Sequence, residues 1–205
     1  MINPGDTLEN PITGETMIFH ETSAETGGQV VRVETIVRPD GFVAAAHVHP
    51  FQTERFDVLD GTVGFRVGKD EITATSGDTA MVPPGTAHKF WNAGETDARF
   101  IVEVRPALQF ESLIETMFAL AEKGKTNARG FPNPLQLAVI ARAHFDTVRL
   151  PFPPVALQRA ALAVGSSVGR ALGYASVIER ERTRGIARRY DRGRPHGAPV
   201  RRGAR

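Results

Sequence analysis

The chain contains no cysteine, and this absence excludes several kinds of site at once. Without cysteine there are no disulfides, no thiolate metal ligands and no cysteine nucleophiles. Any metal site must therefore use imidazole nitrogen and oxygen ligands. Apolar residues still make up 41% of the 205 residues, which is enough for a packed core and argues against a wholly disordered chain.

Two sequence features connected with membranes are also missing. No stretch of about 18 consecutive apolar residues occurs, so we expect no transmembrane helix. Residues 1–6 show neither the basic segment nor the apolar segment of a signal peptide. We therefore expect a cytoplasmic protein that does not bind membranes.

Positive charge is concentrated at the end of the chain. The net charge is +2, but residues 179–205 contain ten arginines against three acidic residues, or +7, so residues 1–178 carry −5. We expect this Arg-rich tail to be disordered, because it contains few apolar groups. Ten arginines attract phosphates, but the tail offers only Tyr190 for stacking on a base. We therefore expect a solvated tail and no nucleic-acid partner.

Residues 15–105 show the period of two that is typical of β-strands. Apolar and polar residues alternate over 31–38 and again over 62–67. Turn sequences such as Asp60-Gly61 and Pro83-Pro84-Gly85 separate the apolar stretches at intervals of about 8 to 12 residues. Many short strands at this spacing favour an antiparallel sandwich or barrel.

The period changes to that of a helix after Pro106. Apolar residues recur at intervals of three and four from Phe110 to Ala121, which predicts an amphipathic helix that Gly124 ends. We predict a second helix from Pro134 and a third after Pro153-Pro154, because proline is favoured in the first helical turn. These helices should pack on the barrel or on a second copy of it.

Three glycines recur at every fourth residue in the third predicted helix, at Gly165, Gly169 and Gly173. Such a stripe allows another backbone to approach closely. The alternative is that the helix ends near Gly165. Taken together, the patterns divide the chain into an all-β unit at 1–106, a helical extension at 107–178 and a tail at 179–205.

Two short segments place histidines and a glutamate where their side chains can meet. His47 and His49 are two residues apart, so on a strand they project from the same face. A bend after Pro50 would bring the Glu54 carboxylate to the same point, and His88 lies two residues into a later strand. The spacings are Gly41-x5-His47-x-His49-x4-Glu54-x6-Gly61 and Gly77-x5-Pro83-x-Gly85-x2-His88-x3-Asn92.

At every fixed position these segments resemble the two motifs of the cupin superfamily, and the resemblance covers about residues 30–105. It implies an all-β jelly-roll barrel, also called a double-stranded β-helix, here followed by an α-helical extension like that of some uncharacterised bacterial cupins. It also implies one divalent transition metal (Fe, Mn, Ni or Zn) bound by His47, His49, Glu54 and His88. The alternative is a relative that has kept the barrel and binds no metal.

The expected surroundings of the four ligands suggest a substrate pocket. By alternation Phe56 shares the face of Glu54, and Phe90 shares the face of His88, so we predict both phenylalanines in the pocket. Gln52 is the one additional polar group near the ligands. Glu54 and Gln52 are therefore the candidate catalytic residues.

The sequence places no second carboxylate, lysine or histidine in this pocket. Proton-transfer chemistry needs a positioned acid and base, whereas dioxygen chemistry depends more on the metal. We therefore expect an Fe(II)-type dioxygenase that acts on a small enol, keto or aromatic compound. A non-redox isomerase or lyase and a non-enzymatic small-molecule sensor remain alternatives. We also expect a homodimer, because open edge strands and apolar helices require cover.

Overall fold

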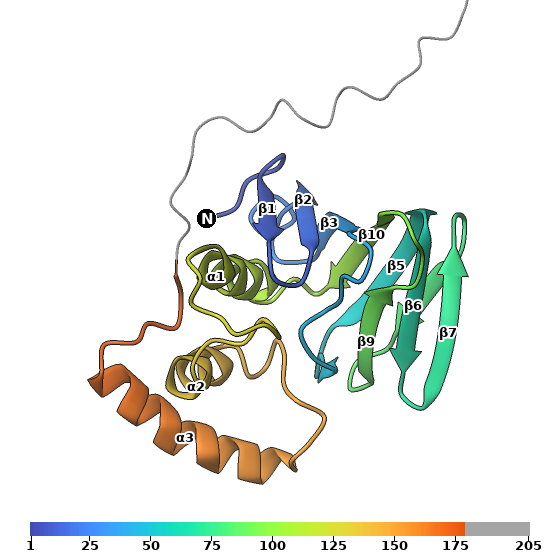
Figure 1. The fold of residues 1–205 in the computed structure, drawn as a ribbon. Coiled ribbons are helices and arrows are strands. Elements are labelled where there is room, and N and C mark those ends of the chain that lie inside the picture. The colour runs from blue at the N-terminus through green and yellow to red at the C-terminus, as the bar shows by residue number, and fades with distance from the viewer. Residues whose placement is uncertain (179–205) are drawn as a thin grey trace, which may run out of the picture.

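The structure is a computed structural model, and it describes residues 1–178. These residues form ten strands followed by three helices (Figure 1). The strands are β1 (Thr7–Asn10), β2 (Glu15–Glu21), β3 (Val31–Val37), β4 (His47–Val48), β5 (Thr53–Asp60), β6 (Thr62–Val67), β7 (Asp70–Thr75), β8 (Thr79–Val82), β9 (Ala87–Asn92) and β10 (Ala98–Arg105). The helices are α1 (Phe110–Glu122), α2 (Pro134–Ala143) and α3 (Val155–Ala171).

The strands form two antiparallel sheets that make a β-sandwich. One sheet has the order β1-β2-β3-β10-β5-β8, and the other has the order β4-β9-β6-β7. Four phenylalanines from both sheets meet between them, with ring centroids 5.1 to 6.1 Å apart: Phe56, Phe65, Phe90 and Phe100. The prediction of an all-β jelly roll followed by helices is confirmed.

Local sequence signals mark the end of α1 and the start of α2 as predicted. α1 begins at Phe110 and ends before Gly124, whose φ of +64° suits glycine. α2 begins with Pro134, and the side chain of Asn133 accepts hydrogen bonds from the backbone N–H groups of Leu135 and Gln136. This cap satisfies two donors that the helix itself leaves free.

Helix α3 continues past Gly165, so the alternative of a helix that ends there is wrong. A Cβ atom at Gly169 would lie 2.7 Å from the Val139 side chain and 2.8 Å from the carbonyl oxygen of Leu135. Val139 and Leu135 both belong to α2, and the Leu135 oxygen is part of the backbone of that helix. The glycines of α3 therefore let α2 and α3 pack backbone against backbone within the same chain.

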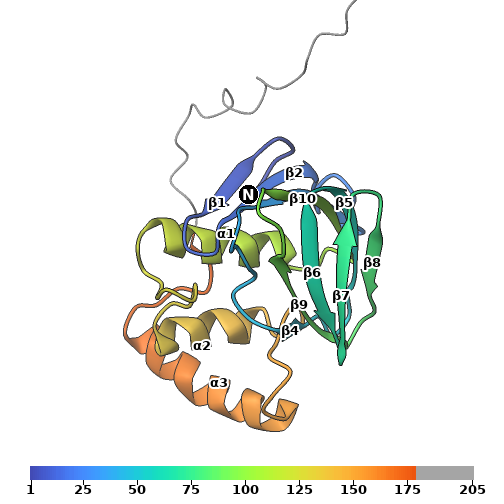
Figure 2. The same cartoon turned by 45° about the vertical axis from the view of Figure 1, so that its right-hand side comes forward.

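The three helices lie on one side of the β-sandwich, with α3 outermost (Figures 1 and 2). α1 packs against β1, and α2 packs between α1 and α3. No helix within residues 1–178 is long and apolar enough to cross a membrane. The predicted tail at 179–205 lies outside the described residues.

Candidate metal centre

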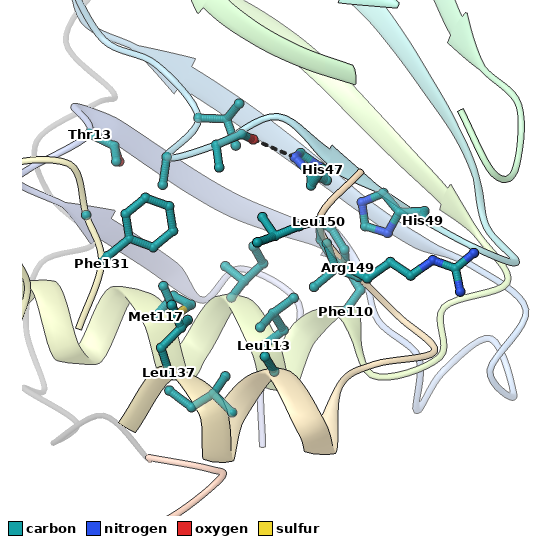
Figure 3. Close-up of a pocket in the computed structure, with 18 of the residues that line it drawn as sticks. Thr13, His47, His49, Phe110, Leu113, Met117, Phe131, Leu137, Arg149 and Leu150 are labelled. Carbon is teal, nitrogen blue, oxygen red and sulfur yellow. Dashed lines mark hydrogen bonds between the residues drawn. The ribbon is translucent and has the colours of Figure 1, made fainter. Parts of the chain in front are cut away.

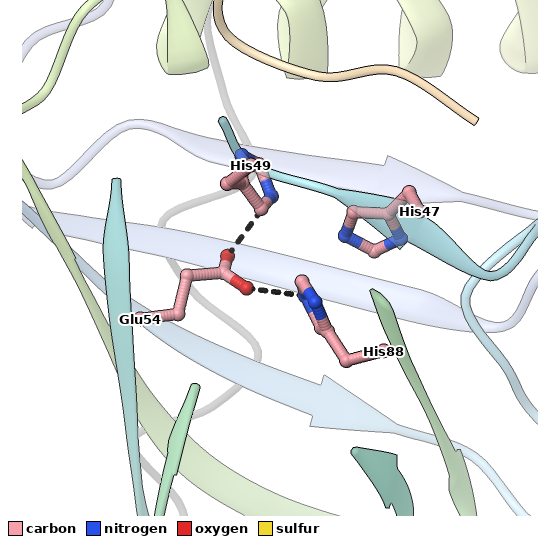
Figure 4. A group of neighbouring side chains, drawn as sticks. All are labelled: His47, His49, Glu54 and His88. Atoms are coloured by element: carbon pink, nitrogen blue, oxygen red, sulfur yellow. Dashed lines mark ion pairs between the residues drawn. The ribbon is translucent and has the colours of Figure 1, made fainter. Parts of the chain in front are cut away.

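The four predicted ligands meet at one point in the structure (Figure 4). Antiparallel pairing of β4 with β9 sets His47 opposite His88. His49 directly follows β4, and after a short turn Glu54 is the second residue of β5. Each side chain offers a ligand atom, and these atoms all lie within 4.8 Å of one another. The predicted convergence of the four side chains is thus confirmed.

Backbone carbonyls set the tautomer of each imidazole. Each histidine has its Nδ1 atom within hydrogen-bonding distance of a carbonyl oxygen. A carbonyl can only accept, so Nδ1 carries a proton, and Nε2 is the ring nitrogen that faces the site and is available to a metal ion. The three contacts are His47 with Ala45 at 2.9 Å, His49 with Thr147 at 2.6 Å and His88 with Thr86 at 3.1 Å. Bonds of this kind orient the histidines of metal sites.

The inward-facing atoms of the site lack hydrogen-bond partners. Nε2 of His49, Nε2 of His88 and Oε2 of Glu54 are buried, and none has a partner within the described part of the chain. Nevertheless Nε2 of His88 lies 2.6 Å from Oε2 of Glu54, and Nε2 of His49 lies 3.4 Å from Oε1. Lone pairs that face one another in a buried site are costly unless a proton or a metal cation lies between them. The donor set therefore fits a metal ion.

The charge states of the free site also suit a cation. Burial, together with the neighbouring His88 and His49, lowers the pKa of His47 to about 3, so this imidazole is neutral. Burial raises the pKa of Glu54, but the surrounding histidines outweigh burial and bring it to about 2. Burial lowers the pKa of His88, yet the adjoining Glu54 carboxylate outweighs it and raises the pKa. The site thus carries a carboxylate that attracts positive charge.

Gln52 holds His49 in position and does not line the cavity. Its side chain is fully buried, and Oε1 lies 2.8 Å from Nδ1 of His49. Its amide Nε2 donates to the carbonyl oxygens of Pro106 and Ala107, at 2.8 and 3.0 Å. These hydrogen bonds give Gln52 a positioning role, and the catalytic role predicted from sequence stays a prediction. Sequence reasoning missed Thr147, which acts through its carbonyl group and so leaves no signal in residue type.

A cavity of about 580 Å³ adjoins the metal centre. His47, His49 and Glu54 lie on its wall, and both predicted pocket residues, Phe56 and Phe90, line it. The three helices supply the opposite wall with mostly apolar side chains (Figure 3). They include Phe110, Leu113, Ile114, Met117 and Phe118 of α1, Leu137 and Ile140 of α2, and Leu162 of α3. The helical extension therefore forms one wall of the pocket.

One wall of the same cavity is polar, and this corrects the sequence analysis. The expectation that no second carboxylate faces the pocket is wrong, because Glu15 lines it and is only 4% exposed. Burial raises the pKa of Glu15 to about 7, although a hydrogen bond from Thr13 opposes the rise. The alternation Glu15-x-Met17-x-Phe19 could have indicated its direction, since Met17 and Phe19 are also buried.

Comparison with known protein families gives a match within the β-sandwich. Residues 33–104 match a family model described as "Cupin domain". No curated protein sequence matches the chain.

Several solved structures are similar to about half of the chain. A predicted oxalate decarboxylase from Thermotoga maritima is 19% identical over 49% of this chain and 90% of its own, with a TM-score of 0.45. An RmlC-like cupin from Shewanella frigidimarina is 17% identical over 52% and 88%, also with a TM-score of 0.45. A sugar phosphate isomerase from Silicibacter pomeroyi is 23% identical over 51% and 67%, with a TM-score of 0.41. Similarities this distant say nothing about the reaction.

Proposed function

We propose that this chain, which carries a domain of the cupin superfamily, is a metal-dependent enzyme that acts on a small, largely apolar compound by Fe(II)-type dioxygenase chemistry. One observation supports the metal-dependent part above all others. Three buried ligand atoms without hydrogen-bond partners face one another, and two of them belong to residues on the wall of a large, mostly apolar cavity, His49 and Glu54. A protein rarely retains unsatisfied polar atoms in its interior unless a ligand or ion satisfies them.

The bound ion would be held by His47, His49, Glu54 and His88. When bound, a redox-active ion such as Fe(II) supplies electron transfer between an organic substrate and dioxygen. Glu54 remains ionised at neutral pH and offsets part of the charge of the ion. The carbonyl groups of Ala45, Thr86 and Thr147 hold the imidazoles in place, so the site needs little reorganisation.

The apolar lining supports an enol, keto or aromatic substrate. Phe56 and Phe90 stand beside the metal ligands and can pack against a planar compound. Side chains of α1 and α2 form an apolar wall on the opposite side. A sugar phosphate would require several charged or polar partners that this lining lacks along most of its length.

Glu15 favours a second candidate, a non-redox isomerase or lyase. A buried carboxyl group with a pKa of about 7 can act as an acid or a base near neutral pH. However, its hydrogen-bond donor Thr13 lies at the end of the pocket remote from His49 (Figure 3). This position suits contact with a distant part of the substrate better than proton transfer beside the metal. A non-enzymatic sensor would use the same pocket without turnover.

Metal content and oxygen uptake test the proposal. Protein purified without a metal-affinity tag should bind about one divalent ion per chain. The Fe(II) form, kept anaerobic until assay, should consume oxygen with an enol, a diketone or a catechol. Glu54→Ala and His88→Ala should abolish uptake, whereas Phe90→Ala should alter substrate preference and leave metal content unchanged. His20→Ala is the matched control, because His20 pairs with Glu34 away from the site.

The possible outcomes separate the candidates. Turnover that is equally fast with Zn(II) under argon would replace dioxygenase chemistry with Lewis-acid catalysis. Stoichiometric metal and tight ligand binding without any turnover would identify a sensor. Full metal occupancy in the His88→Ala protein would show that the site itself is wrongly assigned.

A further inference from the structure

The end of the cavity opposite His49 contains several polar side chains that the metal centre does not use, among them Glu15 and Thr35. Glu15 and Thr35 both line the pocket, with exposed fractions of 4% and 0%. The Thr35 hydroxyl is buried and has no hydrogen-bond partner in the described part of the chain. Burying a hydroxyl without a partner costs on the order of 1 to 3 kcal/mol. A bound ligand that accepts a hydrogen bond from Thr35 would remove this cost.

Strand pairing brings the two side chains close together. β2 pairs with β3 so that Glu15 lies opposite Val37 and Met17 lies opposite Thr35. Glu15 and Thr35 are therefore diagonal neighbours, and both face the cavity. Diagonal neighbours in a sheet are roughly 7 to 8 Å apart, so one atom between their side chains can contact both.

Fixed hydrogen bonds hold Glu15 with one carboxyl oxygen free. Thr13 Oγ1 donates to Oε2 of Glu15 at 2.6 Å, and Thr13 N–H donates to the side chain of Asn10 at 3.2 Å. The other oxygen of Glu15 has no protein partner among residues 1–178. When Glu15 is ionised, the pair offers one acceptor, on Glu15, and one donor, on Thr35. A hydroxyl group, which both donates and accepts one hydrogen bond, matches this pair.

The lining of the rest of the cavity determines the chemistry of the rest of the ligand. Figure 3 shows Thr13 and Phe131 at one end of the pocket and His49 at the other, with Leu113, Met117 and Leu137 along the helical side. A ligand that touches both ends must have an apolar middle part.

We propose that Glu15 and Thr35 form a second binding point for the substrate, which selects a hydroxyl group at the end remote from the metal. This inference rests on the proposed function for the opposite, metal-binding end of the ligand. The substrate class is then a compound with a chelating head, an apolar body and a terminal hydroxyl group. The terminal hydroxyl donates to the free oxygen of Glu15 and accepts from Oγ1 of Thr35.

Matched ligands test the inference on the full-length, Zn(II)-loaded protein. The probes are straight-chain alkyl hydroxamates, which chelate the metal, each with either a terminal hydroxyl or a terminal methyl group. Calorimetric titration over a series of chain lengths should find a length at which the hydroxyl compound binds about tenfold more tightly. Thr35→Val and Glu15→Leu should each abolish most of this preference and leave the affinity for the methyl compound nearly unchanged. Met17→Leu, on the same wall, is the control and should retain the preference.

A second comparison does not depend on the metal. Metal-free protein should bind 1-heptanol more tightly than 1-methoxyhexane, an ether of the same size that cannot donate a hydrogen bond, and Glu15→Leu should remove the difference. If this preference is present but neither hydroxamate binds the loaded protein, the inference stands and the proposed function fails. If the methyl hydroxamates bind but no chain length shows a hydroxyl preference, the inference is overturned and the proposed function is unaffected. Preference for a terminal ammonium group would also overturn it, in favour of cation binding at Glu15.

Discussion

At the scale of single residues, the metal centre depends on groups that are not ligands. His49 is held by the carbonyl oxygen of Thr147, which follows α2, and by the side chain of Gln52, which is itself tied to the start of the helical extension. A ligand of the barrel is therefore oriented by the helices. This arrangement couples the geometry of the site to the packing of the extension.

Glu15 should make stability depend on pH. Its pKa rises from 4.5 to about 7 in the folded state, so its stabilising contribution is full below pH 4.5 and is lost as the pH rises through 7. Glu15→Gln is neutral at every pH and keeps an oxygen that accepts from Thr13. Its advantage in unfolding free energy over the parent should therefore grow between pH 5 and pH 9, by up to about 3 kcal/mol. Urea unfolding of the metal-free proteins at a series of pH values measures this difference.

Glu103→Gln provides the control for this prediction. Arg105 hydrogen-bonds Glu103 and lowers its pKa, so the control should show no gain at high pH. An advantage of Glu15→Gln that is constant from pH 5 to pH 9 would mean that Glu15 is solvated and that the polar wall of the pocket is wrongly described.

At the scale of elements, the contact between α2 and α3 determines the closed side of the pocket. α3 carries Leu162 into the cavity and lies against α2, which contributes Leu137 and Ile140. The contact is close because Gly169 has no side chain where the α2 backbone approaches. Gly165 and Gly169 thus serve packing inside one chain, whereas Gly173, predicted in the same helix, lies beyond the end of α3 with a φ of +86°.

Gly169→Ala should destabilise the protein although alanine favours helix formation by about 1 kcal/mol. The new methyl group would lie 2.8 Å from the carbonyl oxygen of Leu135, a backbone atom that cannot turn away. We expect a net loss of about 1 to 3 kcal/mol in unfolding free energy, measured by chemical denaturation. Ser167→Ala, at an exposed position of the same helix, should be nearly neutral. A more stable Gly169→Ala protein would contradict the described distance between α2 and α3.

At the scale of the whole molecule, the outer side of α3 exposes an apolar stripe. Leu157, Val164, Val168 and Leu172 are 59%, 69%, 46% and 64% exposed. Successive members of this set are separated by seven, four and four positions in the sequence, so they lie along one side of the helix. Contiguous apolar surface of this kind is commonly an interaction site. The homodimer expected from sequence remains a prediction, and this stripe is where we place its interface.

Light scattering at micromolar concentration should report a dimer for the parent protein. The double variant Val164→Glu with Val168→Glu should be a monomer, because it would bury two unpaired carboxylates at the interface. Ala156→Glu, exposed on another side of α3, is the control and should remain a dimer. A parent protein that is monomeric under these conditions would refute the prediction.

The sequence by itself determined that strands fill residues 15–105 and that helices follow Pro106, the start of α2 at Pro134 and the set His47, His49, Glu54 and His88, but it did not indicate β1. The strands and helices depend on local periodicity and on the spacing of turns, whereas the set of four ligands was implied by the resemblance of two segments to the cupin motifs. The period of two places both histidines on one face whatever lies opposite.

Only the tertiary structure decided which groups contact the buried face of each strand and helix. It placed the carbonyl group of Thr147 against His49, although the two residues are 98 positions apart in the sequence. It also brought Leu135 of α2 against Gly169 of α3. It also turned Glu15 and Thr35 toward a cavity whose far wall is formed by the helices. The physical reason is that residue type and period specify which face of an element is buried, whereas the identity of the facing element depends on how the whole chain packs.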